Sequence, residues 1–261
     1  TDWIYRLLLE QLKHFSISDA SLQLLSVKHQ YRPIYVKNLT WKNSQLRHQG
    51  QGKLHLDEAA SEDEQLSLRL DIEGSGYQPD SLQGQVYLAA RSLDLGRWAS
   101  RQSNPYDSTR KLALEGVINL QAWFDIAQRS ITSAHVEFEP SWLEWKLSEQ
   151  EQYFEVEAGR MLWFTTDKGW RLNSQELAFQ TNQKAWPKLE LAAEKRKEVL
   201  VTSLNRLDTS TLLPLLPLIP IVDLDLLKSW QLLEPKGYVN AIKFSVDDKS
   251  GPQLAFDIEQ L

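Results

Sequence analysis

The sequence alternates apolar and polar residues with a period of two over most of its length. Residues 66–72, for example, read LSLRLDI, with leucine or isoleucine at every second position. Successive side chains of a β-strand point to opposite faces, so such a segment makes one apolar and one polar face. Many further segments share this pattern, and no regular alternation of helix with strand interrupts them. The sequence therefore predicts a mainly-β protein built on antiparallel sheet.

Short polar segments separate the predicted strands, as at 73–80, 166–170, 192–199 and 247–252, and their composition is typical of hairpin turns. The predicted sheet has an apolar face that must be shielded from water. A second sheet packed on that face would make a sandwich. Alternatively, the sheet curls into a trough whose apolar floor stays open. The alternation alone leaves both arrangements possible.

The apolar positions of the predicted strands are the candidate lining residues of such a trough. By the period of two, they share one face of the sheet within each strand. They are Leu66, Leu68, Leu70, Ile72, Val86, Leu88, Leu112, Leu114, Val136, Phe138, Trp145, Phe154, Val156, Leu177, Phe179, Leu189, Leu191, Ile242, Phe244 and Val246.

The first fifteen residues depart from the period of two. Their apolar residues recur at helical spacing, opposite Arg6, Glu10 and Lys13. The pattern predicts an N-terminal amphipathic helix lying over a sheet, because a helix that lies on a membrane surface usually carries more Lys and Arg on its polar face. The apolar stripe consists of Trp3, Ile4, Leu7, Leu8, Leu12 and Phe15.

The segment LLPLLPLIP, residues 212–220, places proline at every third position. Proline removes a backbone donor and clashes with the preceding helical turn, so this run predicts neither a membrane-spanning helix nor a central strand. We expect an extended or kinked apolar segment that lies along the trough, with Leu213 and Leu216 among the lining residues. A buried connector of the protein core is an equally good interpretation.

Composition excludes several classes of protein. The formal net charge is −6, without the basic stripe of a nucleic-acid-binding protein. The absence of cysteine excludes disulfides, a thiolate nucleophile and a cysteine-bound metal. No uninterrupted apolar run reaches the roughly 18–20 residues of a membrane-spanning helix. We expect no nucleic acid as a partner.

No catalytic signature is present, so we expect no enzyme, no cofactor and no metal. The five histidines lack metal-ligand spacing and are expected to be exposed on strands. Asp223 and Asp225 form a suggestive carboxylate pair, but capping of a following helix explains it equally well.

Ten tryptophans offer another possibility. Exposed aromatic rings can stack on sugars, whereas buried ones anchor a core. Trp142 and Trp145 fall on opposite faces of one predicted strand, so one of them is expected to face solvent or a partner. A carbohydrate-binding module, or a closed sandwich-type interaction module, is therefore the alternative function.

Three segments resemble those of the bacterial AsmA-like proteins, particularly the YhdP branch. In each, a strand is joined to a characteristic turn or step: QVYLAARSLDLGRW at 85–98, GRMLWFTTDKGWRLNSQELAF at 159–179 and LLKSWQLLEPKGYVNAIKFSV at 226–246. The apolar proline run precedes the third segment, as it does in the family. Together these segments cover about a third of the chain, in the family's order.

The resemblance implies an elongated, curved antiparallel sheet that forms an open hydrophobic groove, with a few short helices. It implies a non-enzymatic envelope protein that carries phospholipid acyl chains through the periplasm between the inner and outer membranes. It further implies an inner-membrane anchor in the full-length protein and possible envelope partners. Because the sequence starts without methionine and ends within an alternating pattern, we expect residues 1–261 to be one continuous β-groove segment of a longer protein.

Overall fold

The computed structural model describes residues 3, 6–23, 33–56, 64–96, 114–147, 150–218, 236–247 and 251–259. Strands dominate it, as predicted. Fourteen strands follow one antiparallel meander in which each strand pairs with the next along the chain. The exception is β10, which pairs with β9, so that β11 follows β9 in the order. The order does not close, since β1 and β14 are its two ends.

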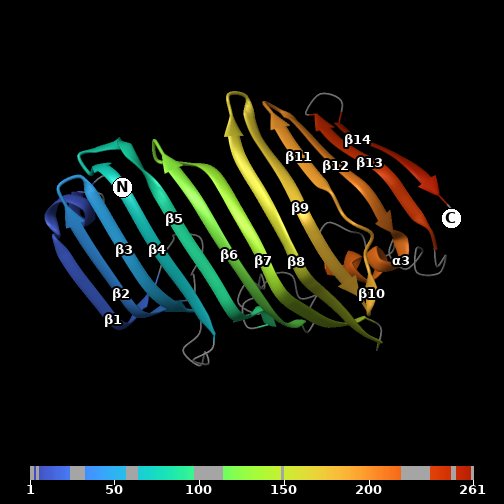
Figure 1. Ribbon diagram of the computed structural model, residues 1–261, viewed down its shortest axis with the longest axis horizontal. Coiled ribbons are helices and arrows are strands. Elements are labelled where there is room, and N and C mark those ends of the chain that lie inside the picture. Colours follow the sequence, from blue (N-terminus) through green and yellow to red (C-terminus); the bar gives the residue numbers. More distant parts are fainter. Residues whose placement is uncertain are drawn as a thin grey trace. The chain divides into compact units, whose positions relative to one another are not determined.

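The chain divides into two compact units, which we describe separately. The first comprises residues 1–111 and 115–136. Its strands lie side by side in chain order, from blue to green in Figure 1. Its elements are η1 (Arg6–Gln11), β1 (His14–Leu22), β2 (Ile34–Ser44), β3 (Arg47–His55), β4 (Gln65–Ser75), β5 (Gln78–Asp94) and β6 (Leu114–Ala127).

The second unit comprises residues 112–114 and 137–261. Strand β7 begins in the first unit and continues into the second. The elements are β7 (Ser130–Leu147), β8 (Gln150–Thr166), β9 (Gly169–Thr181), β10 (Lys184–Ala185), β11 (Leu191–Arg196), β12 (Val199–Asp208), α3 (Thr209–Leu212), η2 (Leu213–Leu218), β13 (Tyr238–Asp247) and β14 (Gly251–Glu259). The composition gave no sign of this division, and the continuity of residues 1–261 as one groove segment remains a prediction.

The hairpin turns lie where the sequence predicted them. Strands β4 and β5, β8 and β9, and β11 and β12 are joined by two-residue turns within the predicted segments, and β13 pairs with β14 across 247–252. Several strands also contain bulges, where the register shifts by a residue. One of them places Ser92 at a positive φ of 49°, with its amide donating to Oδ1 of Asn119. Bulges bend a strand and increase its twist, so these long strands are not flat.

The N-terminal helix is shorter than the sequence predicted. Trp3 and Arg6–Gln11 are helical, the latter with π-helical geometry, but residues 14 and 15 already belong to β1. Phe15 pairs with Trp41 and stacks on its ring, at 6.0 Å between centroids, instead of extending the helical stripe. The residues HFSISDAS alternate, and pairing with β2 satisfies their backbone groups while Phe15 joins the apolar row of Trp41. Ile4 lies outside the described residues.

As predicted, the helix contacts the sheet, at the turn end of its hairpins. Asn43 donates its side-chain amide to the carbonyls of Leu8 and Leu12. The Glu10 carboxylate accepts hydrogen bonds from the Ser75 hydroxyl, at 2.9 Å, and from a backbone amide of the β4–β5 turn, at 2.6 Å. Leu9 is buried by this contact. Two hairpins are thereby tied to one helix.

The histidine at position 48 was expected to be exposed, and this was wrong. His48 is fully buried. One ring nitrogen lies 2.8 Å from Oδ1 of Asn43, and the other lies 2.8 Å from the carbonyl of Gly74. A buried imidazole with both nitrogens paired is a structural residue, and it links β3 to the same hairpin ends that hold η1.

The proline segment is helical instead of extended. Helix α3 is capped by Asp208, and the 3₁₀-helix η2 follows directly. A 3₁₀-helix is normally only one or two turns long, so proline costs it less than it would cost the interior of a long α-helix. Pro220 lies outside the described residues.

The second unit has a small apolar core beneath this segment. Leu177, Leu189 and Leu207 are buried together, and Leu212 of α3 packs against them. Helix α3 also contacts β9 and β12. These contacts support the interpretation of the segment as a core connector, and its lining role in a trough remains a prediction.

Candidate functional site

The predicted apolar positions of the first unit form rows that cross its strands. In one row, Leu70 of β4 pairs with Gly50 of β3 and Val86 of β5. In the next, Leu68 pairs with Gly52 and Leu88. Extended to all six strands, the rows are Phe15, Trp41, Gly50, Leu70, Val86 and Phe124, and Ile17, Leu39, Gly52, Leu68, Leu88 and Ala122.

These rows are not a closed core. All four predicted residues of β4, from Leu66 to Ile72, are half-buried, and so are Val86 and Leu88. A core residue of a sandwich is normally buried on all sides. The apolar face of the first unit therefore remains partly accessible.

Glycines in β3 make room for large neighbours on this face. A Cβ at Gly50 would lie 2.6 Å from Cε3 of Trp41, so the indole ring extends over the glycine. A Cβ at Gly52 would lie 3.1 Å from a methyl carbon of Leu39. The glycines allow broad apolar side chains to lie flat on the sheet.

The second unit has an apolar face of the same kind. In one row, Ala193 of β11 pairs with Leu172 and Thr202. That row continues from Thr202 to Phe244 and Leu254. Exposure increases toward the edge strand, with Phe244 37% and Leu254 60% exposed. The predicted residues Leu191, Ile242 and Val246 occupy neighbouring rows, with Leu204 and Leu200 beside them.

Other predicted lining residues are more deeply placed. Leu177 and Leu189 belong to the buried core, and Phe138, Phe179 and Leu191 pack against it. Phe154 and Phe179 form an aromatic cluster with Trp186, with ring centroids 5.4–6.2 Å apart. Trp145 is only 2% exposed, and its indole N–H has no hydrogen-bond partner among the described residues.

The remaining predicted positions that the structure describes lie on β6, β7, β8 and η2. Leu114, Val136 and Val156 are half-buried on β6, β7 and β8. Leu213 and Leu216 are half-buried on η2. Leu112 lies outside the described residues. The lining role of the whole set remains a prediction.

The sequence analysis missed several residues of the same faces. Leu39, Trp41 and Phe124 belong to the rows of the first unit, and Trp163 and Leu172 to those of the second. The sequence signals for these residues were the segment TWKNS and the motif W-x-L, each of which places a large apolar side chain between polar ones. Pairing register was needed to assign these residues to a face, since strand parity alone fails beyond a bulge.

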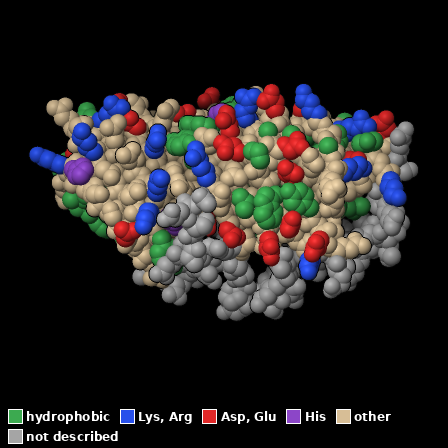
Figure 2. Space-filling model, turned by 60° about the horizontal axis from the view of Figure 1, so that its bottom comes forward, with side chains coloured by type: hydrophobic (Ala, Val, Ile, Leu, Met, Phe, Trp, Pro, Cys, Tyr) green, Lys and Arg blue, Asp and Glu red, His purple; other side chains and the backbone are tan. Residues whose placement is uncertain are grey.

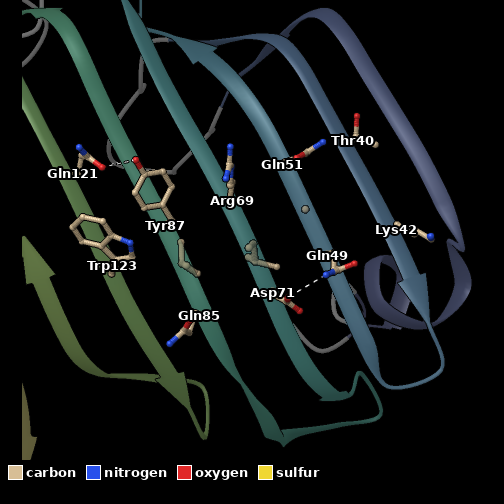
Figure 3. A pocket seen from close by; sticks show the side chains of 13 residues that line it. Thr40, Lys42, Gln49, Gln51, Arg69, Asp71, Gln85, Tyr87, Gln121 and Trp123 are labelled. Atoms are coloured by element: carbon tan, nitrogen blue, oxygen red, sulfur yellow. Dashed lines mark hydrogen bonds between the residues drawn. The ribbon is translucent and has the colours of Figure 1, made fainter.

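The polar face of the first unit carries an open hollow of about 780 Å³. The labelled side chains in Figure 3 come from β2 to β6, on the face opposite the leucine rows. The hollow is lined by Thr40, Lys42, Gln49, Gln51, Arg69, Asp71, Gln85, Tyr87, Gln121 and Trp123, with Gly50, Leu70 and Val86. Two further hollows, of about 750 and 640 Å³, lie in the second unit and share Asn173, Ser203 and Lys243 among their lining residues.

One carboxylate of the hollow is strongly paired. Arg47 donates two hydrogen bonds to Asp71, at 2.9 and 2.6 Å, and Gln49 donates a third at 3.0 Å. The hydrogen bond from Arg47 is the main reason that the pKa of Asp71 is lowered to about 2. Asp71 is therefore a charged acceptor at neutral pH and not a proton donor.

The described part of the chain contains no cluster of three or more potential metal ligands. Asp223 and Asp225 lie outside the described residues. Figure 2 shows positive and negative side chains intermixed on the visible face, with hydrophobic patches between them. Partly accessible apolar rows are the main feature of the described sheet.

Comparison with known families agrees with this architecture. The family model described as YhdP protein matches residues 1–261. The chain belongs to the YhdP family. A relative within this family is the intermembrane phospholipid transporter YhdP of Escherichia coli (strain K12), 22% identical over 265 residues. The match covers 96% of this chain and 20% of that relative, so the chain spans about a fifth of its length. No solved structure matches the chain.

Proposed function

We propose that this chain is a segment of an envelope protein that shields phospholipid acyl chains and conducts them between the inner and outer membranes, without catalysing a reaction. The half-buried apolar rows carry the proposal, because they extend across β1 to β6 and do not form a closed core among the described residues of this unit. The transport activity given in the relative's name supports the choice of phospholipid.

The energetic reason is the cost of exposing an acyl chain to water. Each exposed CH₂ group costs ~0.8 kcal/mol, so about 30 such groups impose a barrier on the order of 20 kcal/mol. A face of leucine, valine and phenylalanine removes most of this barrier. The headgroup needs no binding residue on that face, since it can remain in water.

The site requires no proton transfer and no nucleophile. The ligand is held only by apolar contact, which is non-directional and permits sliding along a row of side chains. The faces therefore suit transport of an unchanged molecule better than catalysis.

The two helical segments would limit the accessible length of each face. Helix η1 lies at the turn end of the β2–β5 hairpins, and the α3–η2 segment lies against β9 and β12. An acyl chain would compete with Leu212 for the cluster around Leu177. We infer that the α3–η2 segment covers part of the second face when lipid is absent.

The proposed location is the periplasm, with the full-length protein anchored in the inner membrane and assisted by envelope partners. No helix in the described part of the chain is long and apolar enough to cross a membrane. Residues 1–261 would then act as one continuous groove segment, and the lining residues predicted from the sequence would contact the acyl chains.

Site-specific photo-crosslinking tests the proposal. A benzophenone amino acid placed at Leu68 or Leu88 should crosslink phospholipid in cells, because both side chains lie on the apolar face. The matched controls are Ser67 and Ala89, which are their neighbours on the opposite face. Mass spectrometry of the purified protein should also detect co-purified phospholipid.

Equal crosslinking from both faces, or none from either, would refute the proposal if the variants fold. A closed interaction module, the alternative from the sequence, would give protein crosslinks from Leu68 and no lipid.

A further inference from the structure

The hollow on the polar face of the first unit has an aromatic wall. Trp123 is 37% exposed, and its ring lies 5.3 Å from that of Tyr87 and 5.2 Å from that of His135. The Tyr87 hydroxyl donates to Gln121 at 2.8 Å, which fixes the tyrosine ring (Figure 3). Tyr87 and His135 thus hold the indole in place from two sides, and the remaining part of its surface is open to solvent on a face that is otherwise polar.

A single register row leads away from this wall. Trp123 pairs with Tyr87, Tyr87 with Arg69, and Arg69 with Gln51. Neighbouring strands are about 4.8 Å apart, so the row extends for roughly 15 Å across the sheet. Stacking groups occupy one end of this row, and hydrogen-bonding groups occupy the other.

The polar groups at that end are not used by the fold. Gln51 and Arg69 make no side-chain hydrogen bond or salt bridge with another described residue, and neither does Lys42 nearby. Arg47 compensates the charge of Asp71. Two cations therefore remain without an acidic partner in the described structure, although the chain as a whole is acidic.

We propose that this hollow binds an acidic polysaccharide, on the face opposite the proposed lipid path. A pyranose ring presents C–H groups that stack on the Trp123 indole, as apolar groups do on aromatic faces. The following sugar would lie over Arg69, which pairs with its carboxylate, while Gln51 and Lys42 bind hydroxyl groups and negative charge.

Other ligand classes fit the hollow less well. An acyl chain needs an apolar floor, whereas the side chains of this row are an amide, a guanidinium and two aromatic rings. A nucleic acid relies on many phosphate contacts, and the hollow offers only two unpaired cations in the described structure. A short row with stacking at one end and hydrogen bonds at the other matches a few linked sugars.

Calorimetric titration of the folded chain with hexagalacturonate tests this proposal, with neutral maltohexaose as the uncharged comparison. We expect the acidic oligosaccharide to bind about tenfold or more tightly than the neutral one at low salt. Trp123→Ala should weaken both by about tenfold, and Trp123→Phe should restore most of the binding. Arg69→Gln should weaken only the acidic oligosaccharide, and Tyr77→Ala, an exposed aromatic outside the hollow, should change nothing.

Several results would overturn the proposal. The first is no binding of either oligosaccharide by the wild-type chain. The second is wild-type affinity in both Trp123→Ala and Arg69→Gln, each shown to be folded by circular dichroism. The third is co-sedimentation with phosphatidylglycerol vesicles that depends on Arg69, which would identify the hollow as a membrane-binding surface. Lipid crosslinking from Leu68 in the Trp123→Ala variant separates a failure here from a failure of the proposed transport.

Discussion

The carboxylate of Asp208 connects the sheet of the second unit to the helical segment that covers it. Its Oδ1 accepts hydrogen bonds from the Ser210 amide at 2.9 Å and the Ser210 hydroxyl at 2.6 Å. Its Oδ2 lies 2.7 Å from Nζ of Lys184 on β10. We predict that Asp208→Ala loosens the α3–η2 segment without unfolding the sheet.

The expected magnitude follows from these contacts. Loss of a helix N-cap costs roughly 0.5–2 kcal/mol. The ion pair adds at most about 1 kcal/mol, because the Lys184 side chain is 54% exposed and returns to water when its partner is removed. The sum is about 0.5–3 kcal/mol. Asp208→Asn should cost less, since asparagine still caps the helix and loses only the charge.

Hydrogen–deuterium exchange of peptides that cover residues 209–218 is the direct measurement. If the segment opens locally, a cost of about 0.5–3 kcal/mol accelerates exchange by roughly 2- to 150-fold. Asp19→Ala is the matched control, because Asp19 forms an exposed ion pair with Lys37 in the other unit. Exchange of residues 209–218 that is no faster in Asp208→Ala than in Asp19→Ala would refute this account of the cap.

Three further predictions concern pH, backbone space and core packing. Burial raises the pKa of Asp208, but the hydrogen bonds from Lys184 and Ser210 outweigh it and the net shift is downward. The contribution of the cap to stability is therefore fully present above the unfolded-state pKa and is lost as pH falls through the lower folded pKa. An equally steep loss of stability with falling pH in Asp208→Asn would contradict this. Gly50→Ala should destabilise by about 1–3 kcal/mol in urea unfolding, because its Cβ would meet Trp41 at 2.6 Å, and an unchanged midpoint would contradict it. Leu177→Ala should cost about 2–5 kcal/mol, whereas Leu68→Ala on the open face should cost less than about 1.5; equal costs would mean that the face is closed.

The strands and their faces could be predicted because the period of two is a geometric property of the extended chain. Leu66, Leu68 and Leu70 share a face whatever they pair with. The same property explains why the family resemblance agreed with the residue pattern, since both depend on strands with one apolar side.

The errors came from interactions that a local pattern does not contain. The burial of His48 depends on Asn43 and on Gly74, which are brought together only by two hairpins. The N-terminal helix ends early because β2 offers partners to residues 14 and 15. The 3₁₀ form of residues 213–218 depends on the cap at Asp208 and on the core beneath it.

The hollow was missed for a different reason. Polar residues on a strand are expected to be solvated, so Gln51 and Arg69 carried no signal of their own. Their significance appears only when the register places them in one row with Tyr87 and Trp123.

The two proposed ligands are separated only by the thickness of the sheet backbone. Val86 contributes to the apolar rows, and Tyr87, the next residue of β5, contributes to the hollow. A slip of one residue in β5 would exchange these faces, placing a tyrosine among the leucines and a valine in the hollow. The bulge near Ser92, fixed by Asn119, absorbs the register shift at the end of β5. Correct register in this strand is therefore a requirement for both binding faces at once, and a variant that shifts it should lose both.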